Sequence, residues 1–397
     1  MTNVEEARKI IWNNTPLGSS FTKMISECHF QVISEEIASP IPFPETRQSA
    51  MDGYAIRYQD YLSGKELTII REIQAGSDPS DILLPPYSAV RIFTGAIVPH
   101  QADTVVVQEK THLVDHLLYI DDTHLIKGAN IRPIGSQCRL GDTLAKPGDV
   151  LTPGMAGLLC SVGIDKVPVY SKPRIAIINT GKELATPGLS KKSFEIYESN
   201  SISLKLALQH YGFDVVYQSC AEDEQPEIIS KALEALPIAD VVLFTGGVSV
   251  GKYDLVIPAL QQLGFEQLFH KIKQKPGKPL YFGRKENQLV FGLPGNPGSV
   301  LTCFYIYVLP CLRKMAGYSK PELFSTLLPL SKAYHKNNHI THFAKAILNQ
   351  QQELEILDHQ ESYKMNSFAK ATCLIEFDEN ETHFHEGQLV KTYIIAN

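Results

Sequence analysis

Carboxylates follow several apolar runs in the middle of the chain, at the points where strands are expected to end. Glu183 comes after the first run, Asp223 after the second, and Asp254 just beyond a glycine-rich loop that follows the third. Ligands of open α/β sheets bind at the carboxyl ends of strands, so these three acids should share one rim. Carboxylates beside phosphates are useful mainly when they hold a hard cation such as Mg²⁺. Glu183 and Asp254 are therefore candidate metal ligands.

Two glycine-rich loops in the same region are suited to receive an anion. The loop GGVSVG contains Gly246, Gly247, Ser249 and Gly251, and the loop LPGNPGS ends on Ser299. Glycine lets the backbone approach an anion closely, and the helix that follows adds its positive N-terminal end. Either loop alone could be a tight strand–helix turn. Together they favour a phosphate-bearing ligand.

A cationic turn lies between these two loops. Lys271, Lys275 and Lys278 belong to a group of four lysines within eight residues, which Pro279 follows. Such a run is usually a solvated surface, but a solvated run needs no rigid prolines. We expect this turn to bind a compact oxyanion. Loops, lysines and acids together predict an enzyme that binds a phosphate-bearing ligand and Mg²⁺, but they do not specify its reaction.

Alternating strand and helix patterns must position these residues. They predict a parallel, three-layer α/β sheet, with strands at 174–179, 214–218, 240–245 and 288–292, and helices at 199–211, 226–236, 255–263 and 299–315.

The remaining segments predict helical and β-rich regions. Thr2 and Glu5 form a candidate capping box for a helix through Trp12, and a second helical stretch is expected around 21–34. Strands are expected at 67–73, 88–93, 104–109 and 116–120. Thr152, followed by a proline, predicts the start of another helix, and the chain from 321 onward predicts a separate β-barrel or sandwich.

Composition excludes several classes of protein. The 397 residues carry a net charge of −6 and are 44% hydrophobic, which argues against disorder and against a nucleic-acid binder. Seven scattered cysteines without a CxxC motif favour reduced thiols. The start has no signal-peptide pattern, and no apolar run reaches about 18 residues. These features predict a soluble cytoplasmic protein.

Motifs along nearly the whole chain resemble the molybdopterin molybdenumtransferase family, which includes bacterial MoeA proteins and the E domain of gephyrin-type proteins. They are SAMDGYA (49–55), RIFTGA (91–96), VVVQE (105–109), IRPIGS (131–136), TGKEL (180–184), ESN (198–200), KPGKP (275–279) and LPGNP (293–297). The resemblance implies a homodimer whose subunits have a helical linker or dimerisation domain (1–40 and 141–170), a β-rich insertion-type domain (41–140), an α/β molybdopterin-binding domain (171–317) and a C-terminal β-barrel-like domain (318–397).

The implied reaction inserts molybdate into adenylylated molybdopterin, with a divalent cation, and releases AMP. Other proteins of molybdenum-cofactor biosynthesis are implied partners. The family's functional acids fall on Asp52, Asp142, Glu183, Asp223 and Asp254. Its substrate- and molybdate-binding residues fall on Thr94, Gly246, Gly247, Ser249, Gly251, Lys271, Lys275, Lys278, Pro279 and Ser299.

Some positions depart from the family pattern. Gly298 stands where valine is common, and Lys345 or His342 stands where relatives carry an arginine fork. Lysine or histidine would hold an oxyanion less rigidly than arginine.

Asp52 lies far along the chain from the α/β loops, so we expect it to enter the cleft of a partner subunit. The alternative is that it caps only its own turn.

Two other functions compete with this interpretation. One is the related adenylyltransferase step, but that enzyme is a single small α/β domain. The other is a non-catalytic scaffold of the same architecture. The presence of every acid and lysine of the motif set favours chemistry.

Overall fold

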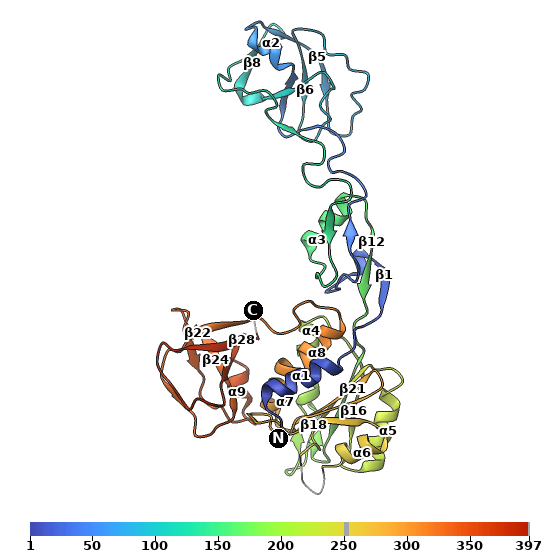
Figure 1. The fold of residues 1–397 in the computed structure, drawn as a ribbon, viewed down its shortest axis with the longest axis vertical. Coiled ribbons are helices and arrows are strands. Elements are labelled where there is room, and N and C mark those ends of the chain that lie inside the picture. Colours follow the sequence, from blue (N-terminus) through green and yellow to red (C-terminus); the bar gives the residue numbers. More distant parts are fainter. Residues whose placement is uncertain (250–253, 396–397) are drawn as a thin grey trace. The chain divides into compact units, whose positions relative to one another are not determined.

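The computed structural model describes residues 1–249 and 254–395, which form two compact units. The larger unit contains residues 1–35, 147–151 and the chain from 168 onward, and the smaller contains 36–146 and 152–167. Figure 1 labels many of the helices and strands of both units. The boundaries of four domains stay a prediction.

The α/β part of the larger unit is built on a six-stranded sheet with the order β16-β13-β17-β21-β20-β18. Its strands are β13 (Ile175–Thr180), β16 (Val215–Ala221), β17 (Val241–Thr245), β18 (Glu266–His270), β20 (Tyr281–Lys285) and β21 (Gln288–Leu293). The four predicted strands are present, and they are parallel. The predicted parallel sheet is in fact mixed, because β20, which was not predicted, runs antiparallel to both β21 and β18. Only two residues separate β20 from β21, and so short a connection permits only a hairpin.

Helices cover both faces of this sheet, as the three-layer prediction requires. They are α4 (Asn200–His210), α5 (Gln225–Ala235), α6 (Val256–Gln262), α7 (Pro297–Cys303) and α8 (Leu309–Met315). Alternate residues of β13 enter separate cores: Ile175 and Ile177 pack with α4 and α7, and Ala176 and Ile178 pack with α5 and α6. The helix predicted at 299–315 is interrupted by a π-helical turn at Phe304–Val308.

The N-terminal segment differs from its prediction in two places. Helix α1 (Val4–Asn14) is capped by Asn3, whose Oδ1 accepts from the Glu6 N–H at 2.8 Å, and not by Thr2. Thr2 instead bridges to Ile272. The helix predicted at 21–34 is absent: the chain there forms β1 (Ser20–Met24), which pairs with β12 (Lys166–Tyr170), and a short 3₁₀ turn, Ile25–Glu27. Backbone pairing to a distant strand therefore outweighed the local pattern.

The C-terminal sheet follows the order β19-β24-β26-β28-β22. Its strands are β19 (Gln274–Lys275), β22 (Ser325–Pro329), β24 (Thr341–Leu348), β26 (Cys373–Phe377) and β28 (Leu389–Ile394), with β25 (Leu354–Ile356) beside β24. β23 (Tyr334–His335) and β27 (His383–Phe384) pair separately, and α9 spans Met365–Phe368. Within the described residues this sheet has two ends, so a closed barrel is not seen. It is also not separate, because β19 comes from the lysine turn.

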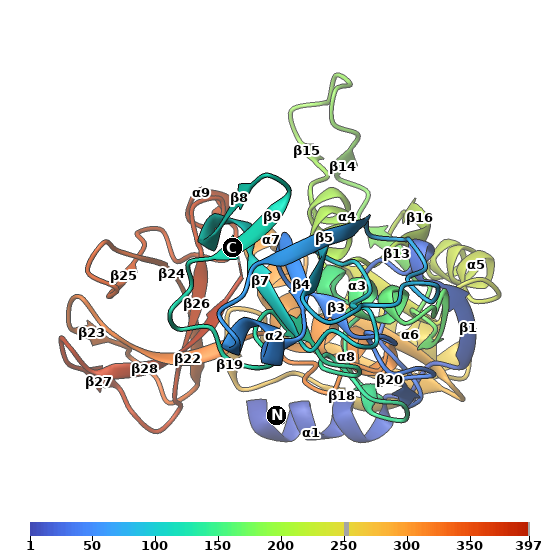
Figure 2. The ribbon, with the colours of Figure 1, turned by 90° about the horizontal axis from the view of Figure 1, so that it is seen from above.

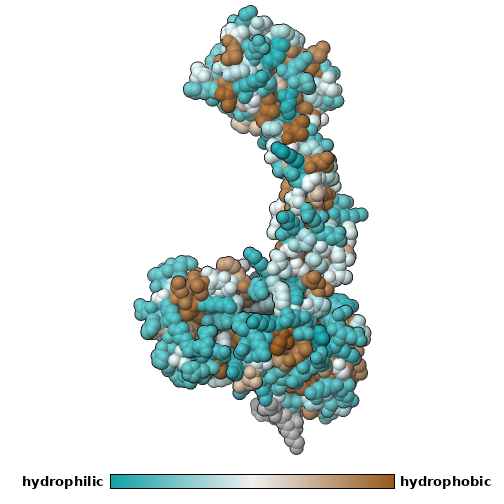
Figure 3. All heavy atoms as spheres, in the orientation of Figure 1, coloured by the Kyte–Doolittle hydropathy of each residue, from teal (hydrophilic) through white to brown (hydrophobic). Residues whose placement is uncertain are grey.

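The edge strand β22 and the residue before it expose apolar side chains. Phe324 and Leu327 are 71% and 60% exposed, and a hydrophobic patch lies over β22 in Figure 3. On the α/β side, the segment between β14 (Leu184–Ala185) and β15 (Ile196–Tyr197) extends away from the sheet (Figure 2).

The smaller unit contains a six-stranded sheet with the order β7-β4-β6-β5-β9-β8. Its strands are β4 (Gly53–Ile56), β5 (Leu67–Ile73), β6 (Ser88–Ile92), β7 (Thr104–Val107), β8 (Thr111–Val114) and β9 (Leu117–Ile120). All four strands predicted here are confirmed. Shorter elements are β2 (Ile37–Ala38), β3 (Gln48–Ser49), α2 (Tyr58–Leu62), β10 (Ile131–Arg132) and β11 (Thr143–Ala145). Helix α3 (Pro153–Ser161) starts as predicted, with the Thr152 hydroxyl accepting from the Met155 N–H.

An ion pair joins α1 to the C-terminal sheet. The Arg8 guanidinium donates to both carboxylate oxygens of Glu376, at 3.1 and 2.9 Å, and to the Tyr393 hydroxyl at 2.8 Å. Burial alone would raise the pKa of Glu376, but the hydrogen bond and charge of Arg8 outweigh it and hold that pKa below its ordinary value.

None of the helices in the described part of the chain is long and apolar enough to cross a membrane.

We predict that Arg8→Met lowers the free energy of unfolding by about 3–5 kcal/mol at pH 7, because it removes the main partner of the Glu376 carboxylate, whose side chain is only 13% exposed. A carboxyl with a depressed folded pKa stabilises the fold above its unfolded pKa of about 4.3, and this contribution is lost as the pH falls through the folded pKa. Urea unfolding of both proteins should therefore show a difference that narrows below about pH 4.

The control is Glu5→Gln, which removes the exposed partner of Arg8 and should cost at most about 1 kcal/mol. A constant difference between Arg8→Met and the parent protein at all pH values would contradict a role for the Glu376 charge.

Candidate active site

Two adjoining cavities lie where the strands of the α/β sheet end. The first, of about 710 Å³, is called here the acidic cavity, and its lining includes Glu183, Asp223 and Asp254. The second, of about 420 Å³, is called the lysine cavity, and its lining includes Lys275 and Lys278. Ser249, Pro279, Pro294, Gly295 and Asn296 line both cavities. Acids and lysines therefore face neighbouring parts of one site.

Close packing of the glycine loop against β13 shapes the floor of the acidic cavity. Gly246 and Gly247 have φ of +84° and +63°. A Cβ at Gly246 would lie 2.6 Å from the Thr180 carbonyl oxygen, and one at Gly247 would lie 2.8 Å from the Thr180 hydroxyl. Both the backbone conformation and the space demand glycine here. Ser249 lines the cavity beside them, and Gly251 lies outside the described residues.

The carboxylates gather on one side of this floor. The Glu183 side chain folds over Gly181, where an added Cβ would lie 2.8 Å from its Oε2. Asp223 accepts from the Lys182 N–H at 3.4 Å. Burial raises the pKa of the Cys220 thiol, and the charges of Glu198, Glu227, Glu183 and Asp223 raise it further. The local field is therefore negative.

This donor set suits a cation that is shared with a substrate. Among the described residues, no three His, Cys, Asp or Glu side chains lie close enough to hold a metal ion by themselves. Mg²⁺ commonly takes only one or two protein carboxylates and completes its shell with substrate phosphates and water. Glu183 and Asp254 in one cavity fit that pattern.

Asn200 adds an acceptor without a partner to the same cavity. Its Nδ2 donates to the Gly295 carbonyl at 2.9 Å, and a carbonyl can only accept, so the amide orientation is set. Its Oδ1 is buried and has no hydrogen-bond partner in the described structure. A buried unpaired acceptor is costly, so this oxygen is suited to receive a donor from a ligand. The motif ESN contained this residue, but the sequence analysis assigned it no role.

A buried glutamine shapes the lysine turn from within. Gln274 is 1% exposed, and its amide donates to the carbonyls of Pro276 and Gly277 at 2.9 and 3.4 Å. The hydroxyl of Tyr307, on the π-helical turn, donates to its Oε1. These bonds leave Lys275 and Lys278 exposed on the outside of the turn. Because its contacts are tertiary, no sequence pattern identified Gln274.

A loop of the C-terminal sheet completes the lysine cavity. Gln360 and Ser362 line it together with Ser299, which is buried at the start of α7. The Asn296 amide donates to the Ser362 hydroxyl at 2.8 Å. On the other side, the His270 ring nitrogen Nε2 donates to the Val248 carbonyl at 2.8 Å and supports the glycine loop. Sequence analysis had not singled out Gln360, Ser362 or His270 as site residues.

Four of the predicted site residues are not brought to these cavities within the larger unit. Lys271 is not among the lining residues: its carbonyl accepts from the Thr2 N–H. Asp52, Thr94 and Asp142 belong to the smaller unit.

Within the smaller unit, Asp52 is tied to Thr94. Asp52 Oδ1 accepts from the Thr94 backbone N–H and hydroxyl, both at 2.7 Å, and these bonds lower its pKa. Two predicted site residues, Asp52 and Thr94, therefore contact each other, and Asp52 does not merely cap its own turn. Asp142 Oδ2 accepts from the Arg139 N–H at 2.7 Å and closes a local turn.

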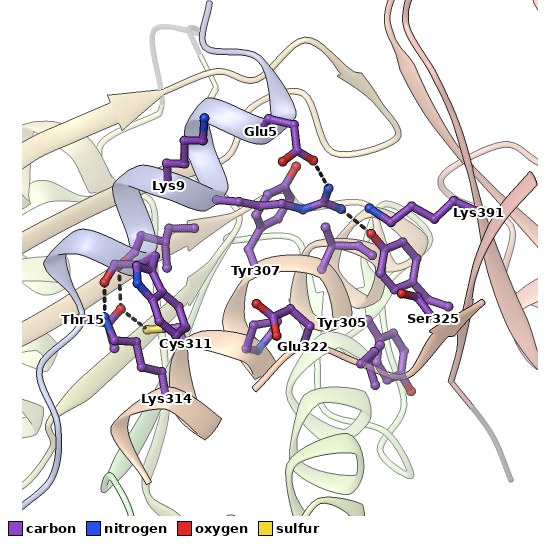
Figure 4. A pocket seen from close by; sticks show the side chains of 17 residues that line it. Glu5, Lys9, Thr15, Tyr305, Tyr307, Cys311, Lys314, Glu322, Ser325 and Lys391 are labelled. Atoms are coloured by element: carbon purple, nitrogen blue, oxygen red, sulfur yellow. Dashed lines mark hydrogen bonds and ion pairs between the residues drawn. The ribbon is translucent and has the colours of Figure 1, made fainter. Parts of the chain in front are cut away.

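Another cavity, of about 350 Å³, lies between α1, α8 and the C-terminal sheet (Figure 4). Glu5, Lys9, Lys314 and Lys391 mix both signs of charge around it. None of the predicted site residues lines it.

Comparison with known proteins gives consistent matches along the chain. Residues 2–163 match the MoeA N-terminal region (domain I and II), residues 176–314 a probable molybdopterin binding domain, and residues 328–395 the MoeA C-terminal region (domain IV). A molybdopterin molybdenumtransferase of Haemophilus influenzae is 33% identical over 98% of both chains. One from a Nostoc species is 33% identical over 81% of this chain and 76% of its own.

Solved structures agree with these matches. A molybdopterin biosynthesis MoeA protein from Pyrococcus horikoshii has a TM-score of 0.84 and 25% identity over 99% of this chain and 100% of its own. The fold is thus shared along essentially the whole chain.

The sequence assigns a compact oxyanion to the lysine turn, and molybdate is a suitable probe of that expectation. We predict that Gln274→Met weakens binding of this probe about tenfold and destabilises the fold by about 1–3 kcal/mol, because it leaves buried carbonyls and a hydroxyl without partners. Calorimetric titration with molybdate and urea unfolding measure the two effects. The control is Gln288→Met: the Gln288 amide donates to the carbonyls of Leu236 and Ala239, and this residue lines neither cavity. It should lose stability and keep molybdate affinity; equal affinity losses in both variants would refute the assignment.

Proposed function

Because this chain belongs to the molybdopterin molybdenumtransferase (MoeA) family, we propose that it inserts molybdate into adenylylated molybdopterin and releases AMP. The observation that carries this proposal is the pairing of an acidic cavity with a lysine cavity across one shared wall. The substrate carries phosphates, and molybdate is a second anion. A scaffold or an adenylyltransferase would not account for matches along the whole chain to molybdenumtransferases.

In this proposal the lysine cavity receives molybdate. Lys275 and Lys278 present two ammonium groups on a turn that Gln274 and the prolines hold in place. A preorganised turn avoids much of the entropy cost of ordering two long side chains around a small dianion. Lys271 contributes at most to the potential around the turn.

The acidic cavity in turn receives the adenylate side of the substrate. Glu183 and Asp254 would hold Mg²⁺, which when bound supplies positive charge against the phosphates during cleavage of the pyrophosphate bond. Asp223 adds to the same negative field. Gly246, Gly247 and Ser249 let the backbone approach the phosphates, and Asn200 Oδ1 accepts from a ligand donor.

We also propose a homodimer in which Asp52, Thr94 and Asp142 belong to the partner's cleft. Within one chain these residues belong to a different compact unit from the two cavities. Seven free cysteines support a reducing, cytoplasmic location, where other cofactor-biosynthesis proteins would deliver the substrate.

We predict that the protein releases AMP from adenylylated molybdopterin only when molybdate is added. Lys275→Ala and Lys278→Ala should each raise the molybdate concentration for half-maximal release by one to two decades, because one charge-assisted contact is worth about 1.5–3 kcal/mol. Lys273→Ala is the control, since Lys273 is exposed and lines neither cavity. AMP release that does not depend on molybdate would refute the proposed function. An unchanged molybdate requirement in both lysine variants would refute the assignment of the molybdate site to Lys275 and Lys278.

A subunit-mixing experiment tests the shared cleft and the Glu183 role together. Asp52→Ala and Glu183→Gln proteins should each lose most activity. After exchange, random pairing leaves about a quarter of all clefts intact if each cleft combines both subunits, so activity should partly return. No recovery despite demonstrated exchange would place Asp52 outside the partner's cleft, and full activity of Glu183→Gln would remove Glu183 from the reaction.

A further inference from the structure

The loop at 359–364 of the C-terminal part is fastened to a buried lysine. Lys345, on β24, is 3% exposed. Its Nζ donates to the backbone carbonyls of His359, Glu361 and Lys364 at 3.1, 3.5 and 3.5 Å. A lysine ammonium has three N–H donors, and three carbonyls account for all of them. No donor of Lys345 is left for an oxyanion.

A glutamine of the loop locks the same connection. Gln360 Oε1 accepts from the Lys345 backbone N–H at 2.9 Å, and its Nε2 donates to the Lys345 carbonyl at 2.8 Å. The Ser367 hydroxyl donates to the His359 carbonyl at 2.7 Å. The loop is therefore tied to β24 through both the side chain and the backbone of Lys345.

The far side of the loop rests on α7, where only glycine leaves room. The Gly298 N–H donates to the Ser362 carbonyl at 2.9 Å. A Cβ at Gly298 would lie 2.8 Å from that oxygen, and valine would intrude further. The φ of Gly298 is not positive, so glycine is needed here for space and not for backbone conformation.

The loop fastened in this way forms part of the proposed site. Gln360 and Ser362 line the lysine cavity, and Tyr363 lines the acidic cavity. Gly298 and Lys345 were noted in the sequence as two independent departures from the family pattern. In the structure both contact the same loop: Gly298 contacts Ser362, and Lys345 contacts the residues on either side of it.

We propose that Lys345 and Gly298 are positioning residues that dock the 359–364 loop as a wall of the lysine cavity, and that Lys345 acts on the bound anion only through this loop. The proposal rests on the proposed function in one respect: the anion used to test it is molybdate. A lysine that lacks free donors cannot replace an arginine as a ligand, but it can replace an arginine as an anchor.

The experiment compares Lys345→Met with Lys336→Met. Lys336 is also a buried lysine of the C-terminal part, 4% exposed, and its Nζ donates to the carbonyls of Ile340 and Asp378. It lines neither cavity. Both variants lose a buried ammonium among carbonyls, so any general cost of that loss affects both.

Two readouts separate positioning from stability. Hydrogen exchange of the Gly298 amide reports whether the loop stays docked, and calorimetric titration with molybdate alone reports binding without catalysis. Lys345→Met should abolish protection of that amide and weaken molybdate binding about tenfold, while kcat at saturating molybdate changes little. Lys336→Met should change neither.

Gly298→Ala disturbs the same loop from the side that rests on α7. It should weaken molybdate binding to a similar degree, and the double variant with Lys345→Met should be no worse than either alone, because both changes undock one loop. Additive losses of molybdate affinity in the double variant would contradict the proposal that both residues act through one loop.

Other outcomes also decide the proposal. Weaker molybdate binding in Lys345→Met with full Gly298 amide protection would make Lys345 a direct anion ligand and overturn it. Unchanged molybdate binding despite undocking would overturn it as well. If the parent protein bound molybdate but released no AMP, the proposed function would fail while the docking of the loop remained measurable.

Discussion

The parallel pairing of β19 with β24 is the constraint on which the candidate site depends. It brings Lys275 opposite His342 and so makes the lysine turn an edge of the C-terminal sheet. Buried Gln274 fills the inside of the turn, which leaves the lysines only the outer surface. Loss of this pairing would separate the lysines from the loop at 359–364, and the lysine cavity would lose one wall.

Charge is separated across a short distance in this site. Carboxylates and the unpaired oxygen of Asn200 line one cavity, and two exposed lysines line its neighbour. Of these two lysines, Lys275 also affects a buried neighbour: burial first, and then the charges of Lys275, Lys336 and Lys345, lower the pKa of His342 to about 4. His342 is therefore neutral near pH 7 and adds no positive charge beside the turn.

The departures from the family pattern have a common structural explanation. Lysine in place of an arginine weakens a ligand if it must contact an anion. At position 345 the ammonium faces three carbonyls instead, where a compact ammonium serves well as an anchor. Gly298 gives the same loop room to approach α7. Lys345 and Gly298, which the sequence analysis noted separately, thus contact the same loop.

The sequence by itself determined most elements of the α/β part and the grouping of three acids in one cavity. Periodicity gave the four parallel strands and all the helices of the α/β part except the π-helical turn, because those signals are local. Strand ends placed Glu183, Asp223 and Asp254 at one rim, since parallel strands carry their carboxyl ends to the same edge. Only the tertiary structure decided the hairpin of β20 and β21, the pairing of β1 with β12, and the roles of Gln274, Asn200 and Lys345. Each of these depends on a partner distant in the chain, and residue type and spacing carry no record of which distant groups a side chain will meet.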